Sequence, residues 1–183
     1  MKKIANLLFE VRMLKDIIRS GYAFLGSGKE SIAEHSFMTA FICFAMAKID
    51  GDIDSEKLVT MALIHDIAEA RTGDFNYVEK KYSTVDEARA ISHLIKHLSF
   101  GKDIKTLMDE FNAGKTKEAQ LANDADQISF ILELKKIDDT GAKGPEIWFP
   151  VVLKRLKTDM GKEMAQSIME TRWDEWWMND YAE

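Results

Sequence analysis

The sequence predicts an all-α protein, for three reasons. Apolar residues recur at spacings of three and four along most of the 183 residues, and no segment alternates polar and apolar residues as a strand would. Only two prolines and ten glycines interrupt the chain, and the glycines mostly fall between the periodic segments. Residues that cap helices begin several of these segments. Since the sequence contains no repeat or linker, we expect a single domain over residues 1–183, built as a bundle of about seven or eight helices.

The first three expected helices lie in the N-terminal part of the chain. An apolar stripe over residues 4–18 predicts the first helix. The capping-box pattern Ser31-Ile-Ala-Glu34 begins the second, which runs to residue 49. The third covers residues 55–72, and the glycine that follows it is expected to end it.

Similar signals predict the remaining helices. A fourth begins at residues 84–87, residues 103–112 form a short fifth, and residues 117–138 form a long sixth. Pro145 suits the first turn of a seventh helix, and Asp159 is expected to cap the last one.

Composition excludes several classes of function. The 25 Lys and Arg against 31 Asp and Glu give a net charge of −6, which argues against broad contact with DNA or RNA. The single cysteine, Cys43, permits no internal disulfide and fits a reducing compartment. The N-terminus does not resemble a signal peptide, and no apolar run reaches the roughly 20 residues of a membrane span. We therefore expect a cytoplasmic protein with no membrane partner.

Ionisable residues interrupt the otherwise apolar third helix. In helical projection Glu69 falls between His65 and Asp66, and apolar residues fill most of the remaining circumference. Charges buried in this way must be paired or bound to a metal. One interpretation is a buried salt-bridge or hydrogen-bond cluster with Arg71 or with another helix. The other is a metal site to which other helices contribute ligands.

Two other helices offer such ligands. His35 lies in the apolar second helix, where a lone histidine is more often a hydrogen-bonded core residue. The sixth helix carries Asp124 and Asp126, and both lie on apolar sides of it, so periodicity does not choose between them.

The order of these residues resembles the H…HD…D signature of the HD-domain metal-dependent phosphohydrolases. His35, the pair His65-Asp66 and Asp126 occupy the signature positions. The segments LKDIIRSGY, SIAEHSF, IHDIAEARTGD and DADQISFIL resemble the 5′-deoxynucleotidase-like branch of that superfamily in order and spacing. The resemblance covers residues 12–138, and the helices of residues 145–180 are expected to complete the bundle.

The resemblance implies one divalent ion held by His35, His65, Asp66 and Asp126. Such a mixed nitrogen and oxygen site suits Mn²⁺, Co²⁺, Fe²⁺, Ni²⁺ or Zn²⁺. The implied activity is a phosphomonoesterase that acts on deoxyribo- and ribonucleoside 5′-monophosphates. The alternatives are an HD-type hydrolase of a triphosphate, an alarmone or a phosphodiester, and a non-catalytic metal-containing helical protein. The implied partner is a small nucleotide and not a nucleic acid, and a homodimer is one candidate assembly.

The resemblance also implies roles around the ion. Glu69 would orient or deprotonate the attacking water, or alternatively orient His65 through a hydrogen bond. Arg19 would bind the phosphate, unless it is only a solvated charge at a helix end. Tyr22 stands where related chains commonly have a tryptophan against the sugar. Asp74 resembles a position that contacts substrate.

Two further groups resemble functional sites without predicting one. His93 and His97 have the spacing of a helical metal chelate but share a polar side of the fourth helix, so we expect them to be solvated. Trp173, Trp176 and Trp177 are expected to pack in the core or at a dimer contact.

Overall fold

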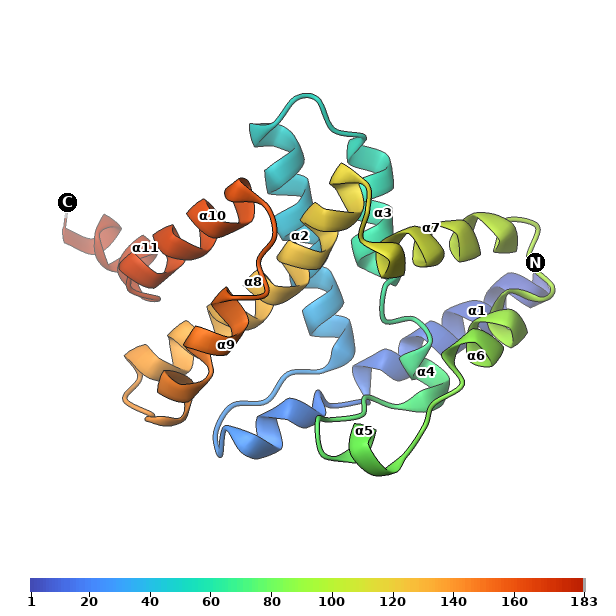
Figure 1. Ribbon diagram of the computed structural model, residues 1–183, viewed down its shortest axis with the longest axis horizontal. Coiled ribbons are helices and arrows are strands. Elements are labelled where there is room, and N and C mark those ends of the chain that lie inside the picture. The colour runs from blue at the N-terminus through green and yellow to red at the C-terminus, as the bar shows by residue number, and fades with distance from the viewer. Residues whose placement is uncertain (183) are drawn as a thin grey trace.

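Three helices cross at the centre of the fold in the computed structural model, which describes residues 1–182 (Figure 1). They are α2 (Ile32–Ile49), α3 (Ser55–Ile64) and α8 (Lys117–Asp139). All three contribute to the larger apolar core, whose fully buried members include Met46, Leu58, Met61, Ile128, Ile131 and Leu134. The prediction of an all-α protein is confirmed, since no strand occurs among residues 1–182.

Other helices cover this centre. α9 (Phe149–Leu153) and α10 (Asp159–Glu170) pack against α8, and α7 (Gly101–Ala113) packs against α3 and α8. A second apolar core joins α6 (Glu87–Ile95), α7 and the residues that follow α3, with α1 (Lys2–Arg12) against its edge. The other segments are α4 (Glu69–Thr72), α5 (Glu79–Tyr82), α11 (Glu175–Met178) and the 3-10 helices η1 (Met13–Lys15), η2 (Ser20–Phe24), η3 (Gly144–Ile147) and η4 (Asp180–Ala182).

Side-chain caps begin the helices that position the site. Ser31 and Glu34 form the expected capping box at the start of α2, because each side chain accepts a hydrogen bond from the other's backbone N–H. Asp54 caps α3, and Thr116 caps α8. These local bonds fix where α2, α3 and α8 begin, and therefore which side chains face the place where they cross.

The first helix is shorter than expected. α1 ends at Arg12, and Ile18 forms an isolated antiparallel bridge with Ser31. The Ile32 N–H donates to the Ile17 carbonyl at 3.0 Å, and the Arg19 N–H donates to the Glu30 carbonyl at 2.9 Å. These bonds use backbone groups that a helix would have satisfied internally, so the apolar stripe is helical only over its first part.

The expected third helix is interrupted. α3 ends at Ile64, four residues form a tight turn, and the chain is helical again in α4. The His65 Nδ1 lies 2.6 Å from the Ala62 carbonyl, and the backbone bonds that follow span three residues, from Ile67 to Ile64 and from Glu69 to Asp66. The expectation of one continuous helix over residues 55–72 is therefore wrong.

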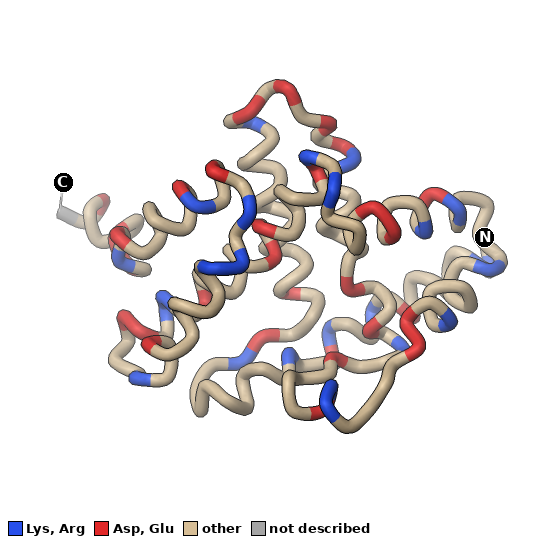
Figure 2. The backbone as a smooth tube through the Cα atoms, in the orientation of Figure 1, with Lys and Arg blue, Asp and Glu red and all other residues tan. Residues whose placement is uncertain are grey.

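The helix α2 is 18 residues long and has a mean hydropathy of 1.3, which are values typical of a membrane-spanning helix. It is the one such helix among the described residues. In the fold, however, it lies at the centre and packs against α3 and α8. Basic and acidic residues are interspersed along the helices of the molecule (Figure 2).

Candidate metal centre

Four ionisable side chains meet where α2, α3 and α8 approach one another. His35 lies in the first turns of α2, Asp126 lies in α8, and His65 and Asp66 follow the last residue of α3. The His35 Nε2 is 2.9 Å from the Asp126 Oδ1, and the His65 Nε2 is 3.0 Å from the Asp66 Oδ2. The Asp66 Oδ2 is also 3.8 Å from the His35 Nε2. The structure thus brings together all four residues of the expected ligand set.

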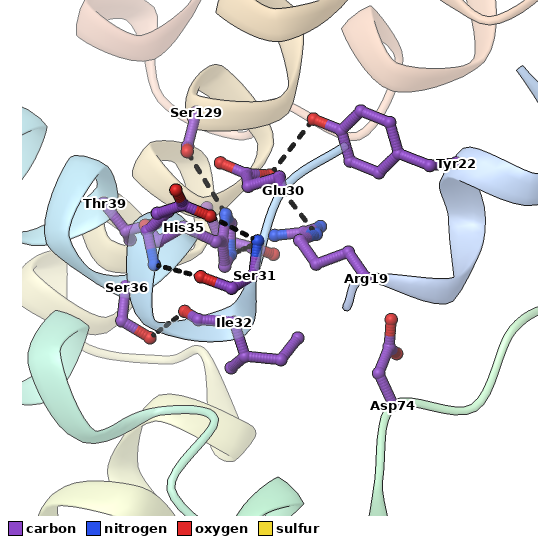
Figure 3. Close-up of polar contacts among 12 residues, drawn as sticks. Arg19, Tyr22, Glu30, Ser31, Ile32, His35, Ser36, Thr39, Asp74 and Ser129 are labelled. Atoms are coloured by element: carbon purple, nitrogen blue, oxygen red, sulfur yellow. Dashed lines mark hydrogen bonds and ion pairs between the residues drawn. The ribbon is translucent and has the colours of Figure 1, made fainter. Parts of the chain in front are cut away.

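The outer nitrogens of both imidazole rings are held by other groups. The His65 Nδ1 donates to the Ala62 carbonyl, and the His35 Nδ1 lies 3.1 Å from the Ser129 hydroxyl (Figure 3). A neutral His65 therefore carries its proton on Nδ1 and turns the lone pair of Nε2 toward Asp66. Both Nε2 atoms are buried, and neither makes a hydrogen bond of good geometry.

These contacts fit a divalent cation. An imidazole lone pair and a carboxylate oxygen about 3 Å apart are both acceptors, and they repel unless positive charge lies between them. Ligand atoms of His35, His65 and Asp126 all lie within 4.8 Å of one another, so one ion can reach all three. Burial lowers the pKa of His65, but the charges of Asp66 and Asp126 outweigh this and raise it to about 9. Asp66 and Asp126 therefore favour positive charge at His65, whereas burial lowers the pKa of His35.

Glu69 lies beside this cluster, but one continuous helix does not bring it there as expected. Helical projection places it between His65 and Asp66, but the interrupted backbone returns it to the site at the first residue of α4. Its Oε2 is buried and has no hydrogen-bond partner. Burial, followed by the charges of Asp66 and Asp74, raises the pKa of Glu69 to about 9. A carboxyl group in this state can donate or accept a proton near neutral pH.

A cavity of about 410 Å³ opens over these residues, within the range of roughly 300–1,000 Å³ that small-molecule sites occupy. Asp66, Glu69 and Asp126 lie in its lining, and so does Arg19 from the segment before α2. The Arg19 Nη1 is buried without a hydrogen-bond partner, so this residue is not the solvated charge of the alternative interpretation. Its guanidinium carbon lies 5.8 Å from the centre of the Phe130 ring.

Tyr22 and Asp74 also line the cavity, and both are anchored to the protein. Tyr22 is buried, and its hydroxyl donates to Glu30 at 3.3 Å (Figure 3). The Tyr22 hydroxyl is therefore already engaged. One Asp74 oxygen accepts from the Ser20 backbone N–H at 2.7 Å and from the Ser20 hydroxyl at 3.1 Å.

The residues considered as alternatives lie elsewhere. Arg71 forms an ion pair with Glu10 of α1 and is not part of the buried cluster. His93 and His97 are exposed as expected, and His97 lies beyond the end of α6. Trp176 is 75% exposed, so it does not pack in the core, and the dimer contact stays a prediction for this residue.

Several cavity residues carry no sequence signal of their own. Phe130 and Trp148 pack edge to face at 5.8 Å, and Arg155, which approaches Gln127 at 3.3 Å, also lines the cavity. Ser129 could have been found from its position, because it lies three residues after Asp126 and so faces the same side of α8. Trp148 and Arg155 come from the C-terminal part of the chain and meet the site only through the fold.

The structure separates the two aspartates of α8 that periodicity left open. Asp126 faces His35, whereas Asp124 is fully buried and points toward the start of α10. Asp124 accepts hydrogen bonds from the backbone N–H groups of Lys157 and Thr158, both at 2.8 Å, and from the Thr158 hydroxyl at 2.7 Å. Asp124 therefore holds α10 against α8, apart from the candidate metal centre.

Replacing Asp124 with alanine should lower the free energy of unfolding by about 3 kcal/mol or more, because it leaves buried donors without partners. Metal content should not change. Asp109→Ala is the control, since its pair with Lys105 is solvent-exposed and contributes little. Denaturant unfolding and elemental analysis measure both quantities. Loss of the metal in a folded Asp124→Ala protein would contradict the division of roles between the two aspartates.

Known proteins resemble this chain in sequence and in structure. The HD domain family model matches residues 11–169. The 5′-deoxynucleotidase HDDC2 of Dictyostelium discoideum is 34% identical over 134 residues, which cover 66% of this chain and 70% of that protein. The PH0347 protein of Pyrococcus horikoshii OT3 has a similar structure, with a TM-score of 0.76 at 28% identity, over 91% of this chain and 98% of that one.

A more distant solved structure shares the fold. The cyanophage S-2L HD phosphohydrolase DatZ, bound to dA and one catalytic Zn²⁺ ion, matches with a TM-score of 0.57 at 20% identity. The match covers 89% of this chain and 96% of that one.

Proposed function

This chain belongs to the HD domain family, and we propose that it is a metal-dependent phosphomonoesterase that hydrolyses nucleoside 5′-monophosphates, deoxyribonucleotides included. One observation carries the proposal: two imidazoles and two carboxylates converge beneath a cavity that also holds a buried, unpartnered guanidinium donor. The relative from Dictyostelium discoideum is named a 5′-deoxynucleotidase, which supports a nucleotide as the substrate.

His35, His65, Asp66 and Asp126 would hold one divalent ion, for which their nitrogen and oxygen donors suit Mn²⁺, Co²⁺, Fe²⁺, Ni²⁺ or Zn²⁺. When bound, such an ion supplies polarisation of a phosphate oxygen and a lowered pKa for a nearby water. The hydrogen bonds at the outer ring nitrogens fix the orientation of both imidazoles before any ion arrives.

The other residues act on the phosphate and on the proton. Arg19 lines the cavity, and its Nη1 has no partner in the protein, so it is available to donate to a phosphate oxygen. The Glu69 Oε2 holds the proton that is exchanged as a water oxygen bonds to phosphorus and the bond to the 5′-oxygen breaks. The products are a nucleoside and inorganic phosphate. Asp74 holds the start of η2 at Ser20, in the lining of the cavity.

The proposal is tested by assaying the metal-loaded protein against matched deoxyribo- and ribonucleoside monophosphates, triphosphates and a phosphodiester. We expect hydrolysis of both kinds of monophosphate. The preference for the deoxy form should be only about 1–2 kcal/mol, because the Tyr22 hydroxyl is engaged by Glu30. Turnover of triphosphates or diesters with none of the monophosphates would replace this function with another phosphohydrolase activity.

Arg19→Ala should lower kcat/KM about 10²-fold for every monophosphate alike, because it removes a preorganised donor to the group that all of them share. Arg12→Ala is the matched control, since Arg12 is exposed and pairs with Asp16 away from the cavity. A loss confined to deoxy or to ribo substrates would show that Arg19 reads the sugar and not the phosphate.

A further inference from the structure

A buried carboxylate outside the expected site contacts two of the residues that line the cavity. Glu30 is 4% exposed and precedes the capping box of α2. Its Oε2 accepts the hydrogen bond of the Tyr22 hydroxyl at 3.3 Å and lies 3.7 Å from the Arg19 Nε (Figure 3). Burying an acidic group is costly unless it is paired, and Glu30 is paired with Arg19.

The backbone holds Glu30 and Arg19 opposite each other. The Arg19 N–H donates to the Glu30 carbonyl, and the next residues, Ile18 and Ser31, form the isolated antiparallel bridge. Ser31 then begins α2, which carries His35 one turn later. A short rigid path therefore connects the guanidinium to the imidazole of the candidate metal centre.

Two groups contact the guanidinium, and one of its nitrogens is left without a partner. Glu30 lies against its Nε side, and the Phe130 ring lies against its carbon. The Nη1 on the far side is buried and has no partner. Glu30 therefore leaves the Nη end of the fork free to meet an oxyanion.

Three further acidic groups near Arg19 also attract its positive charge. Asp126, Asp66 and Asp74 all line the cavity, and their charges, like that of Glu30, favour the charged form of Arg19. Without Glu30, the guanidinium would turn toward these carboxylates and occupy the space into which a phosphate must fit. Burial raises the pKa of Glu30 to about 7 although Arg19 opposes this, so the position is costly for a carboxylate that only stabilises the fold.

We propose that Glu30 is a positioning residue for phosphate recognition, holding Arg19 by its Nε side so that the Nη end faces the substrate and not the metal-binding carboxylates. This proposal rests on the proposed function, from which it takes a nucleoside 5′-monophosphate as the substrate. The effect of Glu30 on the affinity for inorganic phosphate can nevertheless be measured without turnover.

The test compares Glu30→Gln, Arg19→Ala and the double variant, each loaded with metal. Glu30→Gln keeps the shape of the side chain but removes its charge. We expect it to raise KM for dAMP, and the Kd for inorganic phosphate, by about 10- to 100-fold, with a smaller change in kcat and with unchanged metal content. Combined with Arg19→Ala, it should have no further effect, because Glu30 acts through Arg19.

Glu133→Gln is the matched control. Glu133 is a half-buried acid on α8 whose charge acts on Glu30, but it does not line the cavity. We expect wild-type KM and phosphate affinity from this variant. If Glu30→Gln does not fold, Glu30→Asp replaces it, and we expect the shortened carboxylate to raise KM less than Arg19→Ala does.

Three results would overturn the inference: wild-type phosphate affinity in Glu30→Gln, effects of Glu30→Gln and Arg19→Ala that multiply in the double variant, or a KM change equally large in Glu133→Gln. A wild-type protein that hydrolyses no monophosphate would refute the proposed function alone, provided that inorganic phosphate still binds and still depends on Glu30. A wild-type protein that binds no phosphate would refute both.

Discussion

Asp126→Asn should abolish tight metal binding and reduce phosphohydrolase activity by about 10³-fold or more, because the ion is the principal source of positive charge at the reacting phosphate. Asparagine has nearly the same size as aspartate, so the fold should persist. The Asp126 carboxylate is the group that faces the His35 Nε2 at 2.9 Å, and an amide in its place removes a full negative charge from the ligand set. Wild-type protein should hold about one divalent ion per chain.

Thermal unfolding with and without added metal provides a second readout. A ligand that binds only the folded state stabilises it by about 2.7 kcal/mol when its free concentration is 100 times its Kd. We expect this stabilisation in the wild-type protein and in His93→Ala, which removes an exposed histidine, but not in Asp126→Asn or His65→Ala. One ion per chain at wild-type affinity in Asp126→Asn would refute the assignment of Asp126 as a ligand.

Local signals predict the helices that position the site. Contacts within a few residues determine the Ser31–Glu34 capping box, the Asp54 cap and the extent of α8. These features can therefore be predicted from the local sequence. The order of His35, His65-Asp66 and Asp126 likewise predicts which side chains meet.

The interruption after α3 could not be predicted in this way. Apolar residues continue at helical spacing through residues 55–72, because the first part packs in the larger core and Ile67 and Ala68 pack in the second one. The backbone changes course where His65 uses the Ala62 carbonyl, a contact that positions its Nε2 at the site. This side-chain contact therefore accompanies a break that the local pattern does not predict.

The role of Glu30 was equally absent from the sequence pattern. A glutamate before a capping box is ordinarily a solvated residue, and nothing in its immediate neighbours indicates otherwise. It becomes buried because residues 17–19 leave the first helix and pair with residues 30–32. Such a pairing between separate segments depends on the whole fold.

Glu69→Gln should retain the metal and lower kcat by about 10²-fold or more, which is the usual contribution of a positioned acid or base. Glutamine keeps the size of the side chain, and Glu69 is not one of the four residues that surround the candidate ion. Its buried, unpartnered Oε2 and its pKa of about 9 are the properties of a group that exchanges a proton, and an amide cannot do so. Glu56→Gln, on the exposed side of α3, is the matched control.

Metal content and kinetics measured on the same Glu69→Gln sample separate the two interpretations of Glu69. A residue that only orients His65 would change metal affinity when replaced, because His65 would lose a fixed position. His65 is already oriented by its hydrogen bond to the Ala62 carbonyl, so we expect the ion to stay. Loss of metal together with activity would make Glu69 a supporting residue of the metal centre, and unchanged turnover would remove it from the reaction.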